Sequence, residues 1–228
     1  STLIYENEFS INENGLLIEF SSSLNSIFKN SFNKSRYGIK FFNGCEKNSI
    51  SENSFKECNF GIYFDDKSNK NNCFSKNIFI ENGSNIFLNG GNEGVEIPNI
   101  YFAKIFGKSI LISLNSMKEG KVEIFSSDIE GKNSLSFIGE SEINIGENVF
   151  YVLTQDDLQG KYILLTFTDQ SLNTSEFTKI SIDKKAPFLD ITLKGDSKGE
   201  RGRKIEFLST IKNFGDEDIN DVKFRIKI

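Results

Sequence analysis

Histidine is absent from this sequence of 228 residues, and methionine occurs only once. Without histidine a Ser-His-Asp catalytic triad cannot form, and zinc and copper sites lose their commonest ligand. The three cysteines, Cys45, Cys58 and Cys73, are an odd number, and their spacings fit neither stacked repeats nor a metal-binding pair. We therefore predict free thiols, no metal ion and no cofactor.

Basic residues and long apolar runs are also scarce. Lysine and arginine number 27 against 32 acidic residues, which gives a net charge of −5, whereas nucleic-acid-binding domains usually carry a basic stripe. No apolar run approaches the length of about 20 residues that a membrane-spanning helix needs. The chain begins with Ser1 and shows no signal-peptide pattern. We expect a piece of a longer chain with further domains, no nucleic-acid partner and no membrane span in this piece.

An internal repeat occupies the first ninety or so residues. Its apolar positions stay in register through four copies, and one column of asparagines marks each copy, at Asn7, Asn30, Asn53 and Asn77. Two residues after each asparagine comes a phenylalanine, at Phe9, Phe32, Phe55 and Phe79. Short alternating apolar runs separated by Asn, Gly, Ser and Lys are typical of strands and turns, not of helices. The sequence thus predicts a right-handed parallel β-helix of about four rungs over residues 1–92.

Two columns of the repeat suggest corners between strands. Asparagine tolerates the left-handed backbone conformation that a corner requires, and stacked amides can bond from rung to rung. We therefore predict that Asn7, Asn30, Asn53 and Asn77 form a structural corner ladder. The glycine column, Gly15, Gly38 and Gly61, is expected at another corner with positive φ.

The pattern N-x-I-x-x-N-x-F followed by G-I-x-F resembles periplasmic and surface β-helix repeats that are grouped with carbohydrate-binding proteins and sugar hydrolases. It is also similar to the copper-accessory β-helix proteins of nitrous oxide respiration. The resemblance covers residues 1 to about 90 and implies the fold more strongly than any activity.

Beyond Gly90 and Gly91 the pattern changes to seven alternating apolar segments separated by turn signals. This predicts an antiparallel β-sandwich over residues 93–184. The phrase T-D-Q-S-L-N-T-S-E-F resembles a bacterial Ig-like module, in which Asp169 to Glu176 would form the last hairpin turn. Residues 185–228 read as three strands, and I-K-N-F-G-D-E-D-I-N-D-V-K-F resembles the start of a cell-adhesion-related bacterial module. Because about 42 residues are too few for a sandwich core, we expect a partial, truncated second sandwich.

Parallel β-helices also occur in polysaccharide lyases and glycoside hydrolases, which work with paired carboxylates or acidic calcium sites. Asp65 and Asp66 are the candidate pair, but they follow the inward Phe64 where a solvated loop is expected. No acidic column with a basic neighbour is evident. The sequence therefore assigns no catalytic residue and favours a protein that is not an enzyme.

An outward column is a more plausible site for a ligand. Leu17, Lys40, Tyr63 and Phe87 lie between inward apolar residues of successive copies. Aromatic rings stack on sugars, and Lys or Arg can contact carboxylates or hydroxyls. The predicted glycan-contacting face comprises Arg36, Tyr37, Lys40, Phe60, Tyr63 and Phe87. Packing of this face against a loop or the Ig-like module is the alternative.

These patterns together predict a non-catalytic part of a large secreted or cell-surface bacterial protein. The β-helix would be a stalk or a scaffold that contacts a polysaccharide or a host or cell-surface glycan, and the Ig-like modules would be spacers or adhesion units. The expected location is extracellular or on the cell surface, with the periplasm as a further possibility. The alternative is a carbohydrate-active enzyme whose catalytic rungs lie outside this sequence.

Overall fold

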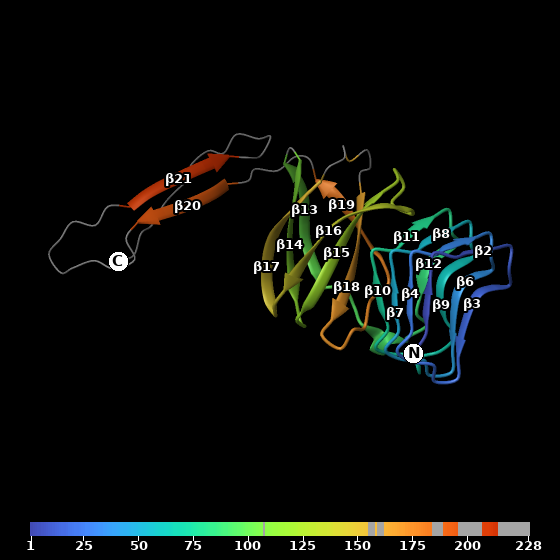
Figure 1. The fold of residues 1–228 in the computed structure, drawn as a ribbon. Coiled ribbons are helices and arrows are strands. Elements are labelled where there is room, and N and C mark those ends of the chain that lie inside the picture. Colours follow the sequence, from blue (N-terminus) through green and yellow to red (C-terminus); the bar gives the residue numbers. More distant parts are fainter. Residues whose placement is uncertain (107, 155–157, 159–161, 184–188, 196–206, 214–228) are drawn as a thin grey trace. The chain divides into compact units, whose positions relative to one another are not determined.

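A computed structural model describes residues 1–106, 108–154, 158, 162–183, 189–195 and 207–213 of the chain. The chain divides into two compact units, Ser1–Ile182 and Asp183–Ile228. The first unit contains a solenoid of stacked rungs followed by an antiparallel sheet (Figure 1). The second unit contains one strand pair within the described residues.

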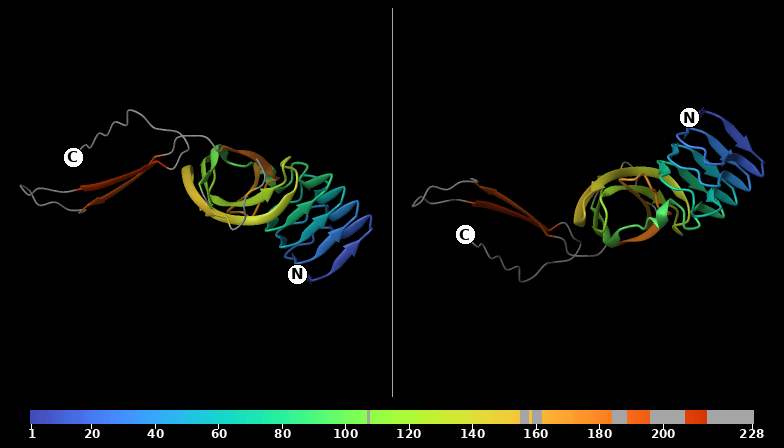
Figure 2. Two further views of the ribbon diagram at one scale, coloured as in Figure 1. Left: turned by 90° about the horizontal axis from the view of Figure 1, so that it is seen from above. Right: turned by 90° about the horizontal axis from the view of Figure 1, so that it is seen from below.

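Each rung of the solenoid contributes one strand to each of three parallel sheets. The first sheet contains β1 (Leu3–Tyr5), β4 (Ser26–Phe28), β7 (Ser49–Ser51) and β10 (Cys73–Ser75). The second contains β2 (Glu8–Ser10), β5 (Ser31–Asn33), β8 (Ser54–Lys56) and β11 (Ile78–Ile80). The third contains β3 (Asn14–Glu19), β6 (Tyr37–Phe42), β9 (Phe60–Phe64) and β12 (Ser84–Phe87). The prediction of a parallel β-helix with about four rungs is confirmed, and Figure 2 shows the rungs stacked.

The core of the β-helix is a set of side-chain stacks that run along its axis. Phe9, Phe32, Phe55 and Phe79 pair in register through β2, β5, β8 and β11. Their rings lie 4.8–4.9 Å apart and nearly parallel. This spacing equals the distance between neighbouring strands, so identical residues at identical positions contact each other in every rung. A fully buried Phe or Ile stabilises by about 1.5–3 kcal/mol, and only stacked rungs can bury these side chains.

Left-handed residues turn the chain at the corner of the Asn7, Asn30, Asn53 and Asn77 ladder, and they are not these four asparagines. Glu6, Lys29, Glu52 and Lys76 have φ of 55–56°, and each directly precedes an asparagine of the ladder. The expectation that the ladder asparagines themselves take this conformation was therefore wrong. The preceding residue makes the turn, and the asparagine side chain can then point into the rung.

The asparagine side chains bond from rung to rung. Asn7 Nδ2 donates to Asn30 Oδ1 at 3.1 Å, Asn30 Nδ2 to Asn53 Oδ1 at 3.1 Å, and Asn53 Nδ2 to Asn77 Oδ1 at 3.0 Å. A second ladder runs along another corner through Asn25, Asn48, Asn72 and Asn92. Most of these amides are buried, and buried polar groups need such partners to avoid a desolvation cost.

The glycine column has a different role from the one expected. Gly15, Gly38 and Gly61 lie within strands β3, β6 and β9, and none has positive φ. A Cβ on Gly38 would lie 2.6 Å from the carbonyl oxygen of Gly61 and from the ring of Phe55. Glycine is required here because the phenylalanine stack passes directly over the backbone.

Seven further strands follow a short 3₁₀ turn, η1 (Asn92–Gly94). They are β13 (Asn99–Phe106), β14 (Ser109–Ser116), β15 (Gly120–Ser127), β16 (Ser134–Ile143), β17 (Gly146–Leu153), β18 (Tyr162–Asp169) and β19 (Thr178–Asp183). Their spatial order is β17-β14-β13-β19-β18-β15-β16. In Figure 2 this sheet curls round on itself, and it encloses a second core that includes Ile112, Ile124, Ile163 and Phe167.

The seven-stranded sheet covers the last rung of the β-helix. Ser134 in β16 pairs with Phe79 in β11, which joins the two parts into one sheet. In the loop between β18 and β19, the Oδ1 of Asn173 accepts from Asn71 N at 2.6 Å and the Oγ1 of Thr174 accepts from Phe74 N at 2.9 Å. Backbone donors that would otherwise face an open sheet edge therefore have partners.

The second unit contains β20 (Leu189–Gly195) and β21 (Phe207–Asn213), which pair antiparallel. They coincide with the first two strands expected after residue 185. The third expected strand, over residues 222–228, lies outside the described residues.

Candidate functional site

The predicted glycan-contacting face lies on the third sheet of the β-helix, where register places its residues side by side. Leu17 pairs with Lys40, Lys40 with Tyr63, and Tyr63 with Phe87 across β3, β6, β9 and β12. Tyr37 pairs with Phe60 at the start of the same strands. All six predicted residues belong to one connected cluster, called the aromatic face below: Arg36, Tyr37, Lys40, Phe60, Tyr63 and Phe87.

Lys40 is the cation at the centre of the aromatic face. Its Nζ lies 5.0 Å from the ring centre of Tyr37 and 5.9 Å from those of Phe42 and Tyr63. No ion pair of Lys40 occurs within the part of the chain that the structure describes. The ammonium is therefore held by ring faces and keeps its hydrogen-bond donors for solvent or a ligand.

Arg36 is placed differently, because a carboxylate already binds it. Its Nη1 lies 2.8 Å from Glu13 Oε1, and both side chains are more than half exposed. The hydrogen bond and the charge of Glu13 raise the pKa of Arg36 above its ordinary value. A ligand at Arg36 would have to compete with Glu13.

The rings of the aromatic face cover one another. Tyr63 and Phe87 stack at 5.4 Å with an interplanar angle of 10°, and Tyr37 and Phe60 stack at 5.5 Å with 15°. Tyr37 is only 8% exposed, whereas Phe87 is 37% exposed. Because the rungs stack the rings along the axis, neighbouring rings cover each other's faces, and Phe87 at the end of the stack is the most exposed of these rings.

Two neighbouring features of this surface were not singled out from the sequence. Phe20 is 68% exposed and its ring meets Phe42 edge-on at 6.2 Å. Glu19 pairs with Phe42 two positions along the strands from Lys40. The register of the repeat contained this information, since Glu19 and Phe42 follow Leu17 and Lys40 by the same two residues.

The candidate carboxylate pair lies in a turn that follows β9. Asp66 Oδ1 accepts hydrogen bonds from the N–H and hydroxyl of Ser68, and Asp65 Oδ1 accepts from Asn69 Nδ2 at 3.2 Å. These bonds close the turn between β9 and β10. Both carboxyls therefore have a local structural role at this corner.

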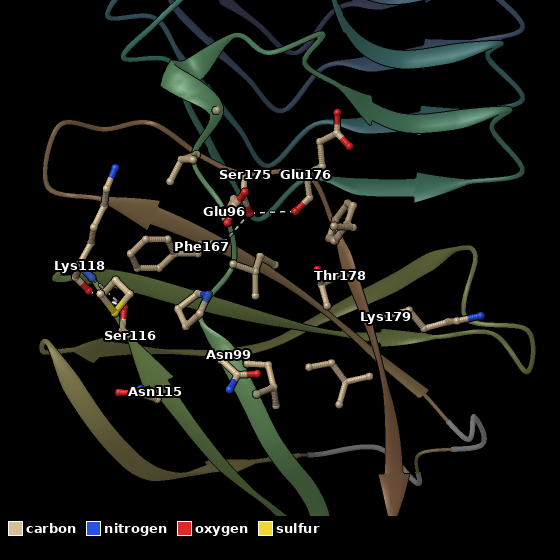
Figure 3. A pocket seen from close by; sticks show the side chains of 18 of the residues that line it. Glu96, Asn99, Asn115, Ser116, Lys118, Phe167, Ser175, Glu176, Thr178 and Lys179 are labelled. Atoms are coloured by element: carbon tan, nitrogen blue, oxygen red, sulfur yellow. Dashed lines mark hydrogen bonds between the residues drawn. The ribbon is translucent and has the colours of Figure 1, made fainter.

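A hollow of about 1200 Å³ lies where the last rung meets the seven-stranded sheet (Figure 3). The two lysines that line this hollow already have partners. Lys118 Nζ lies 3.4 Å from Asp169 Oδ2, and Lys179 Nζ donates to the carbonyl oxygen of Glu130 at 3.2 Å. Glu176 Oε1 accepts from the backbone N–H of Leu88 at 2.8 Å. This last bond ties the last rung to the sheet, so the hollow belongs to the junction of the two parts.

Comparison with known protein families relates the β-helix to one periplasmic family. The family model described as periplasmic copper-binding protein (NosD) matches residues 1–105. This segment contains the whole β-helix, and the match supports a β-helix repeat protein of periplasmic type. Among curated proteins, none matches the chain. No helix in the described part of the chain is long and apolar enough to cross a membrane.

A bound copper ion would depend on the few soft donors that this chain offers. Copper sites in proteins use imidazole, thiolate and thioether ligands, but the chain has no histidine. Its three thiols are free and unpaired with each other. Within the described ranges no three His, Cys, Asp or Glu side chains converge on one point. The residues present do not fit a bound copper ion.

Proposed function

We propose that this chain is a non-catalytic scaffold of an exported bacterial protein, and that its aromatic face contacts a polysaccharide. The observation that carries the proposal is the ammonium of Lys40, which has no ion pair within the described residues and lies in one cluster with the partly exposed ring of Phe87. Sugars offer C–H groups to aromatic rings and hydroxyls to charged side chains, so this combination suits them. The periplasmic type of the matched family supports an extracellular, cell-surface or periplasmic location.

The register of the rungs supports one direction for the proposed ligand. Equivalent positions repeat along the β-helix axis at about 4.8 Å per rung, and the aromatic face spans the rungs of Lys40, Tyr63 and Phe87, with Phe20 one rung earlier. A linear polysaccharide that lies along the axis would meet one side chain after another. A chain that crosses the rungs at right angles would meet far fewer, so we propose the axial direction.

The strand order of the second part supports an Ig-like spacer. An Ig fold places its first, second, fourth and fifth strands in one sheet and its third, sixth and seventh in the other. Here β13, β14 and β17 are neighbours, and β15, β18 and β19 are neighbours, as in that fold. The fourth strand, β16, departs from it because it lies beside β15, and β13 and β19 are neighbours that join the two groups. We propose that residues 93–184 are an Ig-like module and that residues 185–228 belong to an adhesion-type module.

Binding of the 228-residue chain to a panel of bacterial and host polysaccharides tests the proposal. Lys40→Ala and Phe87→Ala are expected to weaken binding of a hit by about tenfold each, which corresponds to about 1.4 kcal/mol. Tyr5→Ala is the matched control: Tyr5 also stacks on an aromatic neighbour, Phe28, at 5.1 Å, but it lies on the first sheet. Equal loss in all three variants, or no hit, would overturn the glycan proposal.

The same experiment also tests the alternative that the chain is a carbohydrate-active enzyme. Each bound polysaccharide is incubated with the protein and its reducing ends or unsaturated products are measured. Cleavage that Asp65→Ala abolishes would replace the scaffold with a carbohydrate-active enzyme.

A further inference from the structure

All soft metal donors of this chain lie within the described residues. They are Cys45, Cys58, Cys73 and Met117. We infer that this chain holds no copper site, and that Cys45 and Cys58 instead occupy corner positions of the β-helix that asparagine fills elsewhere. The inference departs from the copper binding for which the matched family is named.

Cys58 reproduces the asparagine corner in its backbone. It follows Glu57, which has φ of 54°, as Asn53 follows Glu52 with φ of 55°. Its N–H donates to Asn82 Oδ1 at 2.8 Å, as the N–H of Asn53 donates to Asn77 Oδ1 at 3.0 Å. The next rung therefore accepts the same backbone hydrogen bond from Cys58 as it does from a ladder asparagine.

The Cys58 side chain also copies asparagine. Its Sγ lies 3.6 Å from the carbonyl oxygen of Lys56 and 3.8 Å from that of Phe32, which are two and 26 residues earlier in the chain, and its single S–H donates between these two acceptors. Asn30 Nδ2 donates to the carbonyl oxygens at the same two offsets. The thiol thus replaces an amide donor at a fully formed corner.

Cys45 occupies an equivalent corner. It follows Gly44, which has φ of 69°, and its N–H donates to Asn69 Oδ1 at 2.9 Å. Its Sγ lies 3.3 Å from the carbonyl oxygens of both Ile18 and Phe42, and its single S–H donates between these two acceptors. The side chain is completely buried, so its S–H points at backbone carbonyls inside the β-helix.

The chemistry of these thiols opposes copper binding. Copper(I) binds the thiolate and must displace its proton. Burial raises the pKa of Cys45, of Cys58 and of Cys73 above the ordinary value for a thiol. Met117 is 84% exposed in the turn after β14, so it lacks the buried surroundings in which a weak thioether ligand is held.

A copper(I) competition experiment tests the first half of the inference. The reduced, folded 228-residue chain is titrated without oxygen against a chromophoric copper(I) chelator, and the same titration is repeated in denaturant. The folded chain is expected to take no copper from the chelator, whereas the unfolded chain with three accessible thiols takes it. Uptake of one equivalent by the folded chain, lost in Cys45→Asn or Cys58→Asn, would overturn the inference.

Thermal unfolding tests the second half. Cys58→Asn is expected to melt at or above the temperature of the parent chain, because the amide can donate to the carbonyls of Lys56 and Phe32. Cys58→Ala removes the donor and opens a small cavity, so it melts lower. A Cys58→Asn variant that melts below Cys58→Ala would show that this corner does not accept asparagine.

Discussion

The asparagine ladder makes the sharpest prediction about stability, at Asn53. Its side chain is buried and takes part in four hydrogen bonds. Nδ2 donates to Ile27 O at 2.9 Å and to Asn77 Oδ1 at 3.0 Å. Oδ1 accepts from the backbone N–H of Asn30 at 2.9 Å and from Asn30 Nδ2 at 3.1 Å. Asn53→Ala removes all four bonds from the centre of the stack.

The size of the stability loss in Asn53→Ala depends on which hydrogen bonds the partners of Asn53 retain. Asn77 Oδ1 still accepts from the Asn53 N–H, and Asn30 Nδ2 still donates to Ile4 O and Phe28 O. The Asn30 N–H loses this acceptor, and Ile27 O loses a donor. A buried group left without a partner costs about 1–3 kcal/mol, so we expect the free energy of unfolding to fall by about 3–5 kcal/mol.

Asn7→Ala is the matched control, because Asn7 belongs to the same ladder but its side chain is exposed. It donates to Tyr5 O and Asn30 Oδ1, and water can replace it, so a loss of about 1 kcal/mol or less is expected. Urea unfolding followed by circular dichroism measures both variants. Losses that agree within about 0.5 kcal/mol would refute the view that burial gives the ladder its strength.

Asn53→Asp separates hydrogen bonding from size. An oxygen replaces Nδ2 and faces Ile27 O and Asn77 Oδ1, so the charged form is repelled and desolvated. The folded state then holds a proton more tightly than the unfolded state, and the stability of this variant should rise as the pH falls. A variant that shows no greater pH dependence than the parent chain would contradict this geometry.

Three further substitutions and one labelling measurement test other parts of the structure. Gly38→Ala should lower stability by more than the ordinary effect of a surface substitution, because the new Cβ would lie 2.6 Å from the carbonyl oxygen of Gly61 and from the ring of Phe55. A melting curve like that of the parent chain would refute this close approach of Phe55 to the backbone. Cys45 and Cys58 should react with a thiol reagent only at the rate of unfolding, since burial raises both pKa values; rapid labelling of the folded chain would contradict this. Glu123→Ala should lower the free energy of unfolding by about 2–3 kcal/mol, because the buried carboxylate accepts from the Lys76 N–H at 2.9 Å and pairs with Lys121 at 2.9 Å. Limited proteolysis should then cut the last rung faster in this variant than in the parent chain. Burial raises the pKa of Asp128, but hydrogen bonds from Lys132 and Asn133 outweigh it and lower the pKa overall. The stabilisation by the Asp128 carboxylate is therefore complete above the ordinary aspartate pKa and is lost as the pH falls through the lower folded-state pKa. Asp128→Asn should remove this part of the acid sensitivity in a pH series of melting curves.

The sequence alone determined the β-helix, because stacking requires the same residue types at the same place in every rung. The Phe9, Phe32, Phe55 and Phe79 column shows this most clearly. The outward position of Lys40, Tyr63 and Phe87 followed from the same register, since neighbours on a strand alternate between the two faces. Strand-length apolar segments also marked each of β13 to β19.

Only the tertiary structure decided which residue turns each corner. Glu52 and Asn53 both tolerate several conformations as isolated residues, and the choice depends on which side chain finds partners inside the rung. The same holds for Gly38, whose need for a missing Cβ comes from a ring in the neighbouring rung. Local propensity does not contain such contacts, because they join residues about one repeat apart.

The meaning of the cysteines and of the aromatic face depended on the structure for the same reason. From the sequence, Cys58 had no partner at a useful spacing, and its offsets to Lys56 and Phe32 became visible only when the rungs were stacked. Tyr37 looked outward in the pattern, but Phe60, Tyr63 and Lys40 cover its ring. The sequence sets the period and the residue types, and the stacking of rungs decides which side chains touch and which remain free to bind.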